Sequence, residues 1–206
     1  MKLFKVVLVA LVLLVNLVIA PASWADRPKL TNTPEYTEVT QAIASLLQVK
    51  SAPNRSGLAP DEIEQQLGEL KLQKYILETA TEWAQCRNNT GKTLAVYAHK
   101  AKKAAQPSTL YYLGSGKITD DDWNCDGVYL PSGALIANRD QPLAEPLALK
   151  VTPGTQLIAK NDPETGLLEF NVNPAQVFRA GETNWSIPNL SQANIDAKVP
   201  NAPIED

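Results

Sequence analysis

The chain contains two cysteines, Cys86 and Cys125, and each therefore has one possible partner within the chain. A disulfide between them would join two distant segments, and the chain-entropy model assigns a loop of this length about 4 kcal/mol of stability. The net stability of an ordinary domain is about 5–15 kcal/mol, so this bond would constrain the fold strongly. The alternative is a pair of free, buried thiols. The amino-terminal segment favours the disulfide, because it has the pattern of an export signal and disulfides persist in oxidising compartments.

Residues 1–25 have the features of a cleaved signal peptide. Lys2 and Lys5 precede an apolar run over residues 6–20, which is shorter than the roughly 20 residues of a membrane span. Ser23 and Ala25 then place small residues at the positions that signal peptidase reads. We predict cleavage after Ala25, with an uncleaved membrane anchor as the alternative.

The charge balance bears on the class of partner. The chain has 22 acidic and 19 basic residues, and removal of the signal peptide would take two lysines away. A mildly acidic chain without a basic patch argues against nucleic acid as a partner. No second long apolar run follows the signal, so we expect no membrane span after cleavage.

The rest of the chain divides into a helical part, a β part and a tail. Residues 26–80 contain helical periodicity at 34–49 and 60–79, separated by a linker at 51–57. Residues 81–182 alternate between short strand-like segments and turns. Residues 183–206 are polar and contain prolines, and we expect an extended polar tail that lies on the body through Trp185, Ile187 and Leu190.

This organisation predicts an α+β fold, with a short N-terminal helical segment followed by a disulfide-bonded antiparallel β-sandwich or small barrel. A turn at 88–91 separates the first two predicted strands, and the hairpin over 156–172, which turns at 161–166, has the clearest pattern. The predicted strands cover residues 83–87, 92–98, 109–113, 128–130, 134–137, 147–151, 156–159 and 167–172.

Residues 119–127 contain the densest acidic run of the chain. Asp122, Asn124, Asp126 and Gly127 have the spacing D-x-N-x-D-G, which is the first half of a calcium loop. A standard EF-hand is excluded, because position 12 is Gly133 and an EF-hand needs a bidentate Glu there. Two interpretations stay open: an acidic surface turn without a ligand, or a calcium-binding module of another type with Asp122, Asn124 and Asp126 as metal ligands.

Catalytic patterns are weak throughout the chain. His99 is the only histidine, and we expect it to be exposed at the end of a strand. Asp120, Asp121 and Asp122 could act as the carboxylates of a glycan hydrolase, but that chemistry needs two carboxylates facing each other across a cleft. We therefore predict that the protein is not an enzyme and has no cofactor apart from the possible calcium ion.

Two neighbouring segments carry a family resemblance. Residues 72–79 (LQKYILET) and 83–94 (WAQCRNNTGKTL) resemble uncharacterised exported proteins of cyanobacteria. This resemblance covers the middle third of the chain and implies a periplasmic or thylakoid-lumen location rather than release to the medium. It implies no catalytic residues. The leading hypothesis is an exported, non-enzymatic protein that acts through contacts with another exported protein.

Overall fold

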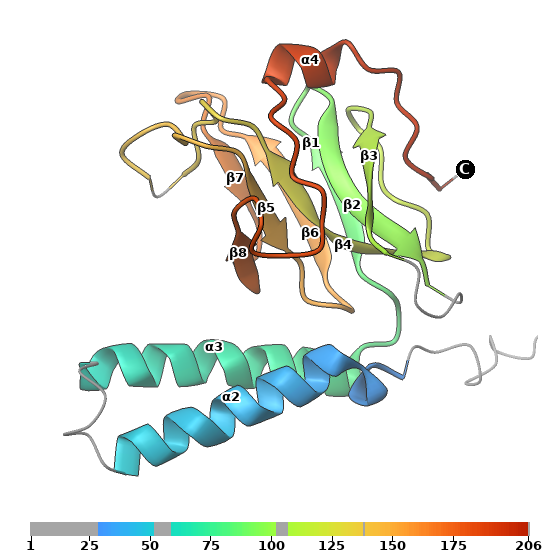
Figure 1. Ribbon diagram of the computed structural model, residues 1–206. Helices are drawn as coiled ribbons and strands as arrows, with labels where there is room; N and C mark the ends of the chain where they lie inside the picture. The colour runs from blue at the N-terminus through green and yellow to red at the C-terminus, as the bar shows by residue number, and fades with distance from the viewer. Residues whose placement is uncertain (1–28, 52–58, 102–106, 138, 206) are drawn as a thin grey trace, which may run out of the picture.

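The computed structural model describes residues 29–51, 59–101, 107–137 and 139–205, and it has the predicted α+β fold (Figure 1). The predicted signal peptide and most of the linker at 51–57 lie outside the described residues. The elements, in chain order, are η2 (Leu30–Asn32), α2 (Pro34–Ser51), α3 (Pro60–Thr79), β1 (Gln85–Asn89), β2 (Leu94–Lys100), β3 (Thr109–Leu113), β4 (Trp123–Leu130), β5 (Leu147–Lys150), β6 (Gln156–Asn161), β7 (Leu168–Phe170), β8 (Gln176–Phe178) and α4 (Gln192–Asp196).

The two long helices form an antiparallel pair that lies beneath one end of the β-sandwich (Figure 1). Each begins with a proline at its first turn, where the missing N–H costs nothing. The Thr33 hydroxyl oxygen accepts a hydrogen bond from the N–H of Tyr36 at 3.4 Å, as expected of a helix cap. Helix α3 buries Ile63, Leu67 and Leu77, whereas no residue of α2 is buried. None of the helices in the described part of the chain is both long and apolar enough to cross a membrane.

The strands form two sheets, ordered β1-β6-β7 and β3-β2-β4-β5-β8. All strand pairs are antiparallel except β1 and β6, which run parallel. The predicted turn at 88–91 therefore does not form a hairpin, because it carries the chain from one sheet to the other. Gly91 at φ +78° allows this change of direction. The buried side chain of Asn88 holds it by donating to the carbonyl oxygens of Lys92 and Leu113, both at 2.8 Å.

The boundaries of further strands predicted from the sequence can be compared with the structure. The predicted hairpin is confirmed as β6 and β7, and its turn is held by the Asp162 carboxylate, which accepts from the Thr165 N–H at 2.7 Å. Residues 134–137 do not form a strand; Ile136 makes only an isolated bridge to Leu168. Strand β4 begins at Trp123, five residues before the predicted start at 128.

The C-terminal tail forms a third layer over the five-stranded sheet. Trp185, Ile187 and Leu190 pack against a buried cluster that includes Tyr97 and Tyr129, as predicted. Trp185 stacks on Tyr97 with ring centroids 4.6 Å apart. The Tyr97 hydroxyl donates to a tail carbonyl oxygen, that of residue 186, at 2.9 Å. The tail is not wholly extended, however, because it contains α4. The main core lies between the two sheets.

Candidate functional site

The disulfide joins the two sheets through the core. Cys86 lies in β1 and Cys125 in β4, with their Cα atoms 5.8 Å apart, and both residues are 0 % exposed. The predicted pairing is confirmed, and the alternative of two free thiols is wrong. The bond fixes the spacing of the sheets close to the acidic stretch.

The three predicted calcium ligands do not lie on one tightly turning loop. Asp122 lies in a turn, where its N–H donates to the Asp120 carboxylate at 2.8 Å. Asn124 and Asp126 lie inside β4, and the Asn124 amide donates to Asp126 Oδ1 at 2.7 Å. The amide oxygen of Asn124 accepts from the Ala84 N–H at 3.0 Å. Calcium binding would therefore compete with hydrogen bonds that the Asn124 and Asp126 side chains already make.

Gly127 has a different role from the turn glycine of a calcium loop, because it lies within β4. A Cβ atom at this position would overlap the carbonyl oxygen of Leu149 and lie 2.7 Å from the Trp185 ring. The absence of a side chain thus allows the tail to pack closely against β4.

Among the described residues, no group of three or more His, Cys, Asp and Glu side chains could hold a metal ion. Calcium binding stays a prediction.

His99 is partly buried, contrary to the expectation of an exposed histidine. Its Nδ1 atom lies 2.7 Å from Asp126 Oδ2, with the two side chains 24% and 13% exposed. The hydrogen bond to Asp126 raises the pKa of His99, burial opposes that shift, and the charges of Asp126 and Glu35 add to it. In the part of the chain that the structure describes, no hydroxyl or thiol bonds the other ring nitrogen. These residues assemble only the acid–histidine half of a catalytic triad.

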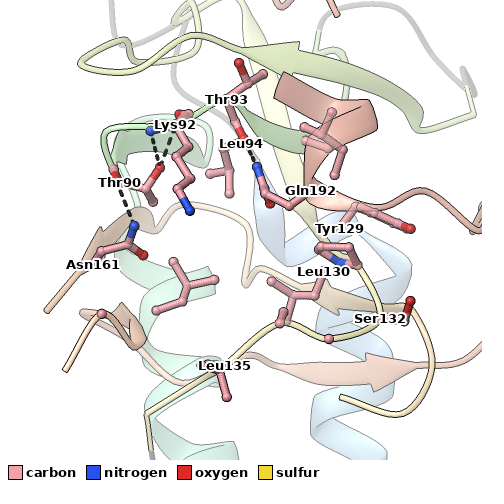
Figure 2. A pocket seen from close by; sticks show the side chains of 17 residues that line it. Thr90, Lys92, Thr93, Leu94, Tyr129, Leu130, Ser132, Leu135, Asn161 and Gln192 are labelled. Atoms are coloured by element: carbon pink, nitrogen blue, oxygen red, sulfur yellow. Dashed lines mark hydrogen bonds between the residues drawn. The ribbon is translucent and has the colours of Figure 1, made fainter. Parts of the chain in front are cut away.

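A hollow of about 240 Å³ lies at the end of the sandwich near α4 (Figure 2). Two amides on its wall tie neighbouring segments together: Asn161 donates to the Thr90 carbonyl oxygen at 2.8 Å, and Gln192 to that of Thr93 at 3.0 Å. Figure 2 shows the Lys92 side chain directed into the hollow. The lining contains no Asp, Glu, His or Cys, so it offers one positive charge and no general acid or base of those types.

Three of the four sheet edges are covered by other segments of the chain. The edge of β1 bridges to Ile118, and the carbonyl oxygen of Tyr112 in β3 accepts from the N–H groups of Asn201 and Ala202. The edge of β7 pairs with residues 135–137 through two hydrogen bonds of 2.9 Å to Leu168. At these positions the backbone groups of the edge are already hydrogen-bonded within the chain and are not offered to another chain.

The fourth edge is different. Strand β8 pairs with β5 on one side, and no segment within the described ranges pairs with its other side. Val177, at the centre of β8, is 45% exposed. Uncovered strand edges are templates for strands of other proteins, and natural proteins usually protect them.

An apolar groove lies beside this edge, between β7 and β8, with a volume of about 380 Å³. A second hollow of about 320 Å³ adjoins it and shares Arg139, Leu147 and Val177 with it. We call the two together the β7–β8 groove. Its apolar wall comprises Ile136, Leu147, Leu149, Phe170, Val172 and Val177.

The helix pair carries another exposed apolar surface. Leu47 of α2 and Leu72 and Tyr75 of α3 are among the most exposed large apolar residues described. These side chains lie on helices whose backbone groups are already paired. The β7–β8 groove differs in combining apolar surface with an unpaired strand edge.

Comparison with known proteins finds no matching family model, no matching curated protein and no matching solved structure. The resemblance to exported cyanobacterial proteins accordingly stays a prediction.

Sequence reasoning did not identify the β7–β8 groove. It placed no strand at residues 176–178, because three residues carry too little alternation to be distinguished from a loop. The signal that was present is the apolar pair Val177 and Phe178 between polar residues. It indicates a short strand, but only the folded chain shows that one side of this strand is uncovered.

Proposed function

We propose that this chain is an exported, non-enzymatic protein that acts by binding another exported protein, in a periplasm or a thylakoid lumen. The observation that carries the proposal is the uncovered edge of β8 beside an apolar groove. An edge strand offers main-chain hydrogen bonds to a partner, and an adjacent apolar groove offers burial of its side chains. Together these features make a protein-binding site.

The other edges strengthen the argument by contrast. The chain uses its C-terminal tail, the segment at 117–119 and the segment at 135–137 to cover the edges of β3, β1 and β7. The short length of β8 limits unwanted association, and its uncovered side leaves the backbone accessible to a specific partner. The core disulfide supports the exported location, because such bonds are rare in reducing compartments.

The test is quantitative capture of partners from the exported-protein fraction of the source organism, using the mature chain as bait. Val177→Lys places a charge on the β8 edge, where lysine disfavours strand pairing. Val199→Lys is the matched control, because Val199 is 83% exposed and lies in the tail. We expect a partner that the wild type and Val199→Lys both retain and that Val177→Lys loses.

A third variant, Leu72→Lys, examines the rival surface on the helix pair. Equal recovery by Val177→Lys and the wild type would contradict binding at β8. Loss of the partner with Leu72→Lys alone would assign the contact to the helices instead. Recovery of no reproducible partner by any form would count against the proposed function as a whole.

A further inference from the structure

Most charged residues around the β7–β8 groove form ion pairs with each other. Arg179 pairs with Glu145 at 2.6 Å and with Glu182 at 3.7 Å, and Glu169 pairs with Lys160 at 2.9 Å. Arg139 lines both hollows of the groove, and no acidic side chain among the described residues pairs with it. The guanidinium group of Arg139 is therefore available to a carboxylate of a partner. An arginine in this position suits a carboxylate, which it can bind through two parallel hydrogen bonds.

The shape of the groove suits an extended chain. The two hollows meet at Leu147 and Val177, so the β8 edge passes between them. In an extended chain, alternate side chains point to the same face and are separated by about 7 Å. Two apolar side chains at positions i and i+2 of a bound strand would therefore enter neighbouring hollows while its backbone pairs with β8.

We propose that the β7–β8 groove binds an extended segment of the partner protein by strand addition to β8, and that the segment carries alternating apolar side chains and an Asp or Glu that pairs with Arg139. This inference rests on the proposed function and names the chemistry of the partner. Because β8 has only three residues, its main chain supplies few hydrogen bonds. The apolar side chains and the charged pair therefore supply much of the affinity and select the segment.

The experiment is selection from a displayed library of random segments of about eight residues, a length typical of strands, on the immobilised mature protein. We expect the retained segments to show apolar residues at alternate positions and an enriched Asp or Glu. On Arg139→Gln the acidic preference should vanish, and a selected segment should bind about tenfold more weakly, the effect of one charged hydrogen bond. Arg179→Gln is the matched control, because Arg179 already has an acidic partner.

Four outcomes would overturn this inference. In the first, the wild-type protein retains no more segments than Val177→Lys does. In the second, the segments selected on Arg139→Gln are still enriched in Asp or Glu. The third is a concentration-dependent dimer lost in Val177→Lys, which would make a second copy of the chain the occupant. In the fourth, the protein retains no segment but binds the fatty acid oleate, and Arg139→Gln weakens that binding; the occupant of the groove would then be a lipid carboxylate. In the first two cases, loss of the natural partner with Val177→Lys would still uphold the proposed function, so the two failures are distinguishable.

Discussion

Gly127→Ala tests whether the packing of the tail on β4 depends on the absence of a side chain. An added Cβ would overlap the main-chain carbonyl oxygen of Leu149 and lie 2.7 Å and 2.9 Å from two ring atoms of Trp185. The carbonyl oxygen belongs to β5, the neighbouring strand, and cannot rotate away as a side chain can. Relief therefore requires that β4 and β5 move apart locally and that the tryptophan shifts.

The expected loss of stability follows from these two movements, the separation of β4 from β5 and the shift of Trp185. Overpacking a well-packed site costs about 1–3 kcal/mol. Displacing Trp185 weakens its stacking on Tyr97 and its edge-to-face contact with Phe178, and aromatic pairs are worth about 0.5–1.5 kcal/mol each. We expect Gly127→Ala to lower the free energy of unfolding by about 2–4 kcal/mol, a large part of a typical domain's 5–15 kcal/mol.

Urea unfolding followed by circular dichroism measures this loss, and tryptophan emission reports whether Trp185 becomes exposed. Gly114→Ala is the matched control, because its Cβ would meet its nearest neighbour at an ordinary 3.6 Å. We expect the control to change the free energy of unfolding by less than about 0.5 kcal/mol, as ordinary surface substitutions do. A similarly small change in Gly127→Ala, with unaltered emission, would refute the reasoning.

Three further predictions concern the covalent bond and the acidic stretch. Replacing Cys86 and Cys125 by Ser opens a loop of 39 residues and should lower the free energy of unfolding by about 4 kcal/mol in urea titrations; a loss below about 1 kcal/mol would contradict this. The bond to Asp126 raises the pKa of His99, so the stabilisation from the charged pair is complete below the unfolded pKa, about 6.5, and fades as the pH rises through the folded pKa. The melting-temperature advantage of the wild type over His99→Gln should therefore shrink as the pH rises above about 6.5, and an advantage independent of pH would refute the charged pair. Because the Asn124 amide already bonds the Asp126 carboxylate, millimolar calcium should leave the melting temperature unchanged relative to chelator, and a clear rise would restore the calcium module.

Local sequence signals were sufficient where an element carries its own boundaries. Helix α3 spans Pro60–Thr79, as its proline start, acidic first turn and apolar stripe indicate. The β6–β7 hairpin follows from the Asp162 turn between two apolar runs. Trp185 was expected on the body because a large aromatic residue in a polar tail gains stability from burial.

Features that depend on distant segments were not predictable. The parallel pairing of β1 with β6 joins strands far apart in the chain, and nothing in either strand specifies its partner. The start of β4 was missed because Asp, Asn and Gly favour turns. Their polar side chains are accommodated in the strand by groups from elsewhere: Asn124 accepts from the Ala84 N–H, and Asp126 pairs with His99.

The β7–β8 groove also depends on segments that are distant in the sequence. Its apolar wall comes from β5, β7, β8 and the segment around Ile136, which meet only in the folded chain. The edge of β8 differs from the other three edges only because distant segments of the chain contact those three in the folded structure. No local pattern around Val177 carries that information.

Site-specific photo-crosslinking tests the central claim most directly. A benzophenone side chain replaces Val177 in one protein and Val199 in another, and each is illuminated with the exported-protein fraction of the source organism. Binding at the β8 edge predicts a discrete adduct from position 177, absent from position 199, in which the crosslinked partner peptide is an extended apolar segment. No adduct at 177, or the same adducts from both positions, would contradict the claim that this edge is the binding site.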